Sequence, residues 1–192
     1  MMETISFYTD IGFWHVLDLA GLDHLYFITA LALPFWFKES KKLIWWVTLF
    51  TIGHTLSLVG NLYLELSFSS YWIELLIPIT IALSTLSLLT ENKIIRTKGR
   101  DFFFSILTVL FGVIHGLGFG RYFNMLIPED AVELSLFSFA LGVELAQLAI
   151  VLVVLFSNEL VVQFFKNSRK KWEFLMGAMI LSQALAMIFE RI

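Results

Sequence analysis

The amino-acid sequence predicts an all-α integral membrane protein, folded as a six-transmembrane-helix bundle in one domain over residues 1–192. Three observations predict this fold class. Hydrophobic residues make up 58% of the chain and charged residues 15%, whereas soluble domains average about 25% charged residues. Six apolar runs are long enough to cross a bilayer, which takes roughly 20 residues. Basic residues gather in alternate connections between those runs.

Each apolar run is expected to form one membrane crossing. The first is rich in Leu, Ala, Ile and Phe, the third contains Pro78, the fourth carries a cluster of glycines, and the sixth ends near the C-terminus. The connections are short, and neither an internal repeat nor a low-complexity linker divides the chain, so we expect a single domain. In chain order the runs cover residues 13–37, 43–64, 72–90, 102–124, 134–157 and 172–190.

The distribution of basic residues orients the bundle. The first, third and fifth connections hold three, four and four of the 13 Lys and Arg residues, whereas only Arg121 and Arg191 fall on the opposite side. Lys and Arg concentrate in cytoplasmic loops. We therefore expect both termini outside and a multi-pass protein of the inner (cytoplasmic) membrane, in contact with the lipid bilayer.

Composition and motifs also exclude several classes of function. The chain has no cysteine, which excludes disulfides, thiolate metal sites and iron–sulfur clusters. The glycine-rich segment 114–120 follows no strand and contains no lysine, so it is not a phosphate-binding loop. No ATP-binding motif is present, and nothing in the sequence predicts a soluble domain or a surface for nucleic acid.

Ionisable residues stand deep inside four of the expected crossings. His24, His54, His115 and Glu144 each lie about 9 to 11 residues from the outer end of a run, roughly 13–17 Å below the outer surface at 1.5 Å per residue. Asp23 shares their level. An ionisable side chain at the centre of a bilayer costs roughly 2.5–3.5 kcal/mol on insertion scales. Such residues need partners, and convergence on one site would supply them.

Imidazole and carboxylate together are ligands for divalent transition metals such as nickel, cobalt, zinc or iron. Other polar or small residues are expected nearby as outer partners or as part of an ion path. Ser57 and Asn61 share a helix face with His54, Gln147 shares one with Glu144, and Gly116 follows His115. Asp18 and Glu74 lie nearer the outer surface. The alternative for each residue alone is ordinary: an interhelical hydrogen bond for a histidine, or solvation at the interface for Asp18 and Glu74.

Whether His15 belongs to the site depends on the shape of the first crossing. On a straight helix His15 and His24, nine residues apart, would point to opposite sides. We therefore predict that this helix is broken near Gly21, with a short outer segment before the membrane span proper. A straight helix would leave His15 outside the site.

Five motifs in order resemble the HupE/UreJ family of small membrane proteins. They are Gly-Leu-Asp-His-Leu-Tyr-Phe at 21–27, Phe-Thr-Ile-Gly-His-Thr-Leu-Ser at 50–57, Glu74, Phe-Gly-Val-Ile-His-Gly-Leu-Gly-Phe at 111–119 and Phe-Ala-Leu-Gly-Val-Glu-Leu-Ala-Gln at 139–147. The resemblance implies a secondary permease for nickel or cobalt. It also implies a functional set of Asp23, His24, His54, His115 and Glu144. The family's first histidine stands closer to the Asp-His pair than His15 does, and Leu17 occupies about that place, so the resemblance assigns His15 no role.

Three functions fit these residues. The first is a permease whose substrate is a divalent cation, bound by a His/carboxylate site in the outer half of the bundle. The second is an intramembrane zinc-type hydrolase acting on a lipid-like substrate, with Glu144 or Asp23 as general base. The third is a metal-binding or assembly subunit of a larger membrane complex. A homo-oligomer is compatible with each.

Overall fold

The computed structural model describes residues 1–192 except 20, 65–67, 90–99, 129 and 165–168. Every regular element in these residues is helical, as the sequence predicts. The chain order is α1 (Met2–Val16), α2 (Asp23–Ala32), the short 3₁₀ helix η1 (Phe37–Glu39), α3 (Ser40–Leu64), α4 (Ser70–Leu89), α5 (Arg100–Leu126), α6 (Val132–Phe164) and α7 (Arg169–Phe189).

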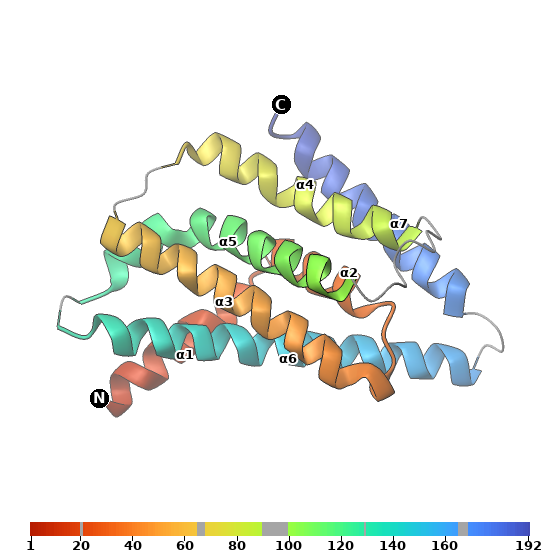
Figure 1. Ribbon diagram of the computed structural model, residues 1–192, viewed down its shortest axis with the longest axis horizontal. Helices are drawn as coiled ribbons and strands as arrows, with labels where there is room; N and C mark the ends of the chain where they lie inside the picture. The colour runs from red at the N-terminus through yellow and green to blue at the C-terminus, as the bar shows by residue number, and fades with distance from the viewer. Residues whose placement is uncertain (20, 65–67, 90–99, 129, 165–168) are drawn as a thin grey trace.

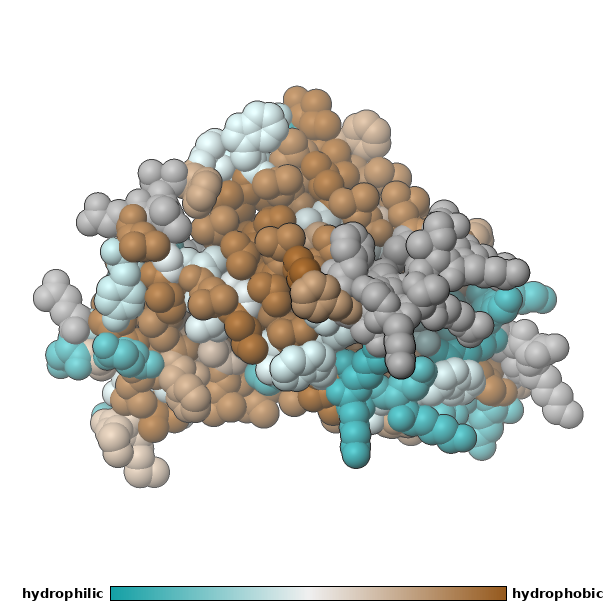
Figure 2. All heavy atoms as spheres, viewed as in Figure 1, coloured by the Kyte–Doolittle hydropathy of each residue, from teal (hydrophilic) through white to brown (hydrophobic). Residues whose placement is uncertain are grey.

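Four stretches of helix are long and apolar enough to cross a membrane: Phe37–Leu64, Ser105–Leu126, Val132–Phe164 and Arg169–Phe189. A fifth, Ser70–Leu86, is apolar but shorter. The face of the molecule in Figure 2 is largely hydrophobic, and its hydrophilic residues gather near the end where α3 begins. Six crossings and outside termini remain predictions. The basic residues of the third connection before Arg100 lie outside the described residues.

The first apolar run is not one helix. α1 ends at Val16 and α2 begins at Asp23, so the predicted break near Gly21 is confirmed. The outer segment is longer than expected, since α1 begins at Met2 rather than at 13. The break does not depend on glycine, however, because a Cβ at Gly21 would meet nothing closer than Asp23 Oδ1 at 4.0 Å.

Figure 1 shows the helices packed in pairs, with α1 beside α6, α3 beside α5 and α4 beside α7, and these pairs make the closest contacts. Glycines set the separation of two of the pairs. A Cβ at Gly12 would lie 2.2 Å from Phe139 O, and one at Gly142 would lie 2.0 Å from Thr9 O. Gly53 and Gly112 allow the same approach between α3 and α5. Small residues are what let helix backbones approach this closely.

α2 is short and is held at its C-terminal end by α6 and α7. The carbonyl oxygens of Leu33 and Phe35 accept hydrogen bonds from Asn158 Nδ2, at 3.0 and 3.3 Å, and from the Arg169 guanidinium, at 3.4 and 3.0 Å. These bonds pair two carbonyl groups just past the end of α2, where the chain leaves the helix. These contacts hold the C-terminal end of α2, the helix whose first turn carries Asp23 and His24.

Candidate metal centre

Three histidines from three helices converge on one point inside the bundle. His15 comes from the last turn of α1, His24 from the first turn of α2 and His54 from the middle of α3. Each offers a ring nitrogen, and these nitrogens all lie within 4.8 Å of one another. The ring centroids are 4.7 Å apart for His15 and His24, 5.5 Å for His15 and His54, and 5.6 Å for His24 and His54. A cation placed among these nitrogens would have three imidazole ligands.

Five ring nitrogens of the four histidines have no hydrogen-bond partner in the part of the chain that the structure describes. Nε2 of His15, Nε2 of His24, both nitrogens of His54 and Nε2 of His115 are all buried without one. Buried polar side-chain atoms are nearly always hydrogen-bonded. Five unpaired nitrogens in one place are therefore an unusual cost, which a metal ion or a bound polar ligand would remove.

Asp23 fixes the orientation of His24. Its Oδ1 accepts a hydrogen bond from the His24 backbone N at 2.9 Å and lies 3.1 Å from His24 Nδ1. Because a carboxylate only accepts, Nδ1 carries the proton and Nε2 keeps its lone pair for a metal. A carboxylate in this position is the usual outer partner of a metal-bound histidine.

His115 lies beside the cluster, on α5. Its ring centroid is 5.3 Å from that of His24. Its Nδ1 lies 2.8 Å from the carbonyl oxygen of Phe111, which makes Nδ1 the donor and leaves Nε2 as an acceptor. His115 therefore presents the same tautomer as His24 next to the three converging rings.

Replacing Asp23 with alanine is expected to weaken metal binding by about 10- to 100-fold, the usual effect of losing such a partner. Asp23→Asn should fall between this variant and wild type, because the amide oxygen can still accept the Nδ1 proton. Titration of the purified protein with Ni²⁺ measures the effect. Asp18→Asn, at an exposed acid in the connection between α1 and α2, is the matched control. Unchanged affinity in Asp23→Ala would show that His24 is oriented without its neighbour.

Aromatic rings cover the histidines along the helix axes. Phe119 lies 4.0 Å from His15 between centroids, and it stacks on Phe139 at 5.3 Å. On the other side, Phe27 stacks on Phe50 at 4.9 Å, and the Phe50 ring lies 5.2 Å from that of His115. Phe27, Phe50 and Phe139 are almost fully buried. The histidines are thus enclosed between two aromatic pairs, in surroundings where electrostatic interactions are strong.

Glu144, predicted to be a ligand, lies in a second polar cluster between α3 and α6. Its Oε1 accepts a hydrogen bond from Thr48 Oγ1 at 2.7 Å, and its Oε2 accepts one from Thr51 Oγ1. Gln147 joins the same cluster, with Oε1 3.0 Å from Thr51 Oγ1. Among the described residues, the group whose ligand atoms converge is His15, His24 and His54, without Glu144.

Two of the predicted outer residues support the centre through the backbone. Ser57 Oγ donates to the His54 carbonyl oxygen at 2.7 Å. Gly116 packs against this turn, since a Cβ there would lie 2.0 Å from Ser57 Oγ and 2.4 Å from His54 O. Both residues therefore act on the position of His54 rather than on a metal.

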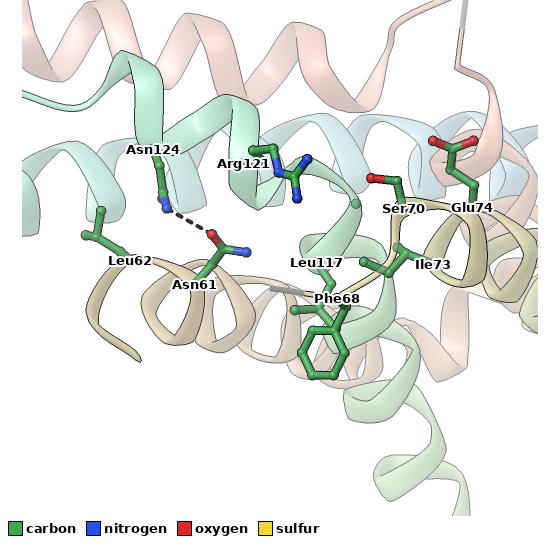
Figure 3. A pocket seen from close by; sticks show the side chains of 10 residues that line it. Asn61, Leu62, Phe68, Ser70, Ile73, Glu74, Leu117, Arg121 and Asn124 are labelled. Carbon is green, nitrogen blue, oxygen red and sulfur yellow. Dashed lines mark hydrogen bonds between the residues drawn. The ribbon is translucent and has the colours of Figure 1, made fainter. Parts of the chain in front are cut away.

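The remaining predicted path residues lie elsewhere. Asn61 and Glu74 line a pocket of about 370 Å³ between α3, α4 and α5, and no histidine lines it. Figure 3 shows the Asn61–Asn124 hydrogen bond, 2.9 Å long, on one side of this pocket, Ser70 and Glu74 on the other, and Arg121 between them. Asp18 is exposed in the connection between α1 and α2.

Sequence reasoning missed Thr48 and the aromatic residues Phe119 and Phe139. Thr48, Thr51 and His54 recur every three residues on α3, and this spacing was a usable signal for the threonine. The aromatic residues carried no such signal, since a membrane protein with 20 Phe places most of them against lipid or core.

Comparison with known proteins gives one match. The family model described as HupE / UreJ protein matches residues 1–191, nearly the whole chain. No curated protein and no solved structure matches the chain. With its all-helical fold and apolar helices, the chain therefore belongs to the HupE/UreJ family.

Proposed function

We propose that this protein is a secondary permease that carries a divalent transition-metal cation, nickel or cobalt, across the inner (cytoplasmic) membrane. The observation that carries the proposal is the convergence of the His15, His24 and His54 ring nitrogens within 4.8 Å, together with their lack of partners among the described residues. The HupE/UreJ family is linked in general to nickel and cobalt transport. The cation is the substrate, held in transit by imidazole nitrogens.

The chemistry of the donors supports this choice of cargo. Imidazole suits nickel, cobalt, zinc and iron, and affinity alone does not separate them, so geometry and supply decide. His24 and His115 each donate the Nδ1 proton to a fixed acceptor. The lone pair on Nε2 of each ring therefore points in a defined direction. Hard cations that prefer oxygen, such as Mg²⁺ and Ca²⁺, find few oxygen donors among the histidines.

The helix order is compatible with six crossings, and the basic connections orient these crossings with both termini outside. α1 and α2 are joined end to end through a break and together make one crossing, and α3 to α7 make five more. Broken helices that carry an ion site at the middle of the bundle are common in secondary transporters. The aromatic pairs above and below the histidines would have to separate in turn for a cation to enter and leave.

Reconstitution tests the proposal. Purified protein in liposomes that contain a metal-sensitive dye should admit Ni²⁺ or Co²⁺ faster than protein-free liposomes. Zn²⁺ and Fe²⁺ measured in parallel give the selectivity. A protein that is correctly inserted and binds the metal with fixed stoichiometry, yet admits none, would contradict transport.

A further inference from the structure

The second polar cluster gathers four oxygen-bearing side chains where α3 packs on α6. Thr48 and Thr51 come from α3, and Glu144 and Gln147 come from α6. Both Glu144 oxygens accept threonine hydroxyls, and Gln147 Oε1 lies 3.0 Å from Thr51 Oγ1. Thr51 and Gln147 are buried, at 7% and 0% exposure. This oxygen cluster combines a carboxylate, two hydroxyls and an amide in one place.

With the Gln147 amide as placed, the oxygen cluster has fewer hydrogen-bond donors than its acceptors need. The single hydroxyl hydrogen of Thr51 faces three oxygens, those of Val47 O, Glu144 Oε2 and Gln147 Oε1. Gln147 Nε2 is buried without a partner among the described residues. Turning the Gln147 amide round would let Nε2 donate to Thr51 Oγ1, which repairs the hydrogen-bond count.

Turning the Gln147 amide does not supply a positive charge for the Glu144 carboxylate. No Lys, Arg or His forms an ion pair with this carboxylate in the described part of the chain. Glu144 lies near the middle of α6, a helix apolar and long enough to cross the membrane. A carboxylate at such a position is costly unless it is paired. A bound cation would supply the missing charge.

The oxygen cluster lies in line with the three histidines along both helices. On α3, Thr51 and Thr48 precede His54 by three and six residues, about 4.5 and 9 Å along the axis. On α6, Glu144 follows Phe139, whose ring packs on His54 and His15. In the orientation that the basic connections predict, both helices lead from the histidines toward the cytoplasm.

We propose that Thr48, Thr51, Glu144 and Gln147 form a second cation site, which receives the transported divalent cation after it leaves the histidines. This inference rests on the proposed permease function. Oxygen ligands hold nickel and cobalt less tightly than imidazole does. Passage from nitrogen donors to oxygen donors therefore takes the cation from capture toward release.

The test separates binding at the histidines from movement through the protein. Glu144→Gln keeps the shape of the side chain and removes the charge, and Glu159→Gln, at an exposed residue of the same helix, is the matched control. Ni²⁺ affinity is measured on purified protein by titration, with X-ray absorption to report imidazole coordination. The Ni²⁺ uptake rate is measured in proteoliposomes.

We expect Glu144→Gln to bind Ni²⁺ through imidazole with affinity within about threefold of wild type, while its uptake rate falls at least about tenfold, as for loss of a charged ligand. Glu159→Gln should match wild type in both measurements. Uptake by Glu144→Gln at the wild-type rate would overturn the second site. Loss of imidazole-bound Ni²⁺ in this variant would also overturn it, because Glu144 would then belong to the histidine site.

If Glu144→Gln does not fold, Thr51→Val decides, since it keeps the shape and removes one oxygen. Thr55→Val, one turn further along α3, is its control. The same pattern is expected, with binding kept and uptake slowed. If the wild-type protein neither binds nor transports Ni²⁺, the permease proposal itself is wrong. If the wild type does both and these variants transport at its rate, only the second site is wrong.

Discussion

Replacing His54 with alanine is expected to abolish high-affinity metal binding, with a loss of at least about 100-fold in affinity for Ni²⁺ or Co²⁺. Losing an outer partner of a ligand already costs 10- to 100-fold, and this variant removes one of three converging imidazoles. Both ring nitrogens of His54 are buried and have no hydrogen-bond partner among the described residues. The substitution therefore breaks no hydrogen bond that the structure describes. Titration of the purified variant measures the loss, and uptake in proteoliposomes should fall with it.

Thr55→Val is the control for His54→Ala, because it changes the adjacent residue of the same helix outside the metal centre. Within the described residues, the Thr55 hydroxyl donates to the carbonyl oxygen of Thr51, at 2.8 Å. Both variants should remain folded, which circular dichroism and gel filtration would report. Near-normal Ni²⁺ affinity in a folded His54→Ala protein would exclude the three-histidine centre. The converged rings would then have a packing role.

Without metal, His54→Ala should differ little in stability from wild type, because a gain and a loss of similar size oppose each other. Unpaired buried nitrogens cost about 1–3 kcal/mol each, and alanine removes two of them, although it also leaves a cavity beside Phe50 and Phe139. Sites that bind a ligand commonly sacrifice stability in this way. A metal-free His54→Ala protein as stable as wild type would fit a balance of these two effects.

Much of the fold could be predicted from the sequence because hydrophobic length is a local property. The second apolar run, expected at 43–64, became α3 at Ser40–Leu64, and the fifth, expected at 134–157, became α6 at Val132–Phe164. The C-terminal end of α6 lies well beyond the expected 157, since its apolar pattern gives no sharp stop there. The break in the first run was predicted from the positions of His15 and His24 and is confirmed, but α1 begins at Met2 rather than at 13.

The candidate centre could be predicted only in part, because the sequence gives the depth of a residue in the membrane but not the direction in which its side chain points. Counting residues from a helix end placed His24, His54, His115 and Glu144 at one level, but it says nothing about which neighbour each faces. Thr48 and Thr51 on α3 hold the Glu144 carboxylate, and this pairing depends on how α3 and α6 are rotated. His15 was predictable from geometry as soon as the helix was taken to be broken, and it is one of the three converging rings.

Gly116→Ala is expected to destabilise the protein by about 1–3 kcal/mol and to weaken metal binding as well. The new Cβ would lie 2.0 Å from Ser57 Oγ and 2.4 Å from His54 O. The serine side chain can rotate away, but the carbonyl oxygen moves only with the backbone of α3. Alanine would therefore push α3 and α5 apart at the turn that carries His54, and it would move that ring from the other two. Thermal unfolding in detergent and Ni²⁺ titration measure the two effects.

Gly118→Ala is the matched control, two residues further along the same helix. A Cβ there would lie 3.2 Å from Ile77 Cδ1, the end of a flexible side chain, and 3.6 Å from Ile73 Cγ2, which is an ordinary contact. Alanine also favours the helix by up to about 1 kcal/mol relative to glycine, so this variant should be as stable as wild type or more so. Adding Ser57→Gly to Gly116→Ala should restore little, because the contact with His54 O remains. Equal stability and equal Ni²⁺ affinity in the two alanine variants would contradict this prediction. The close approach of α3 and α5 at Gly116 would then not position the metal centre.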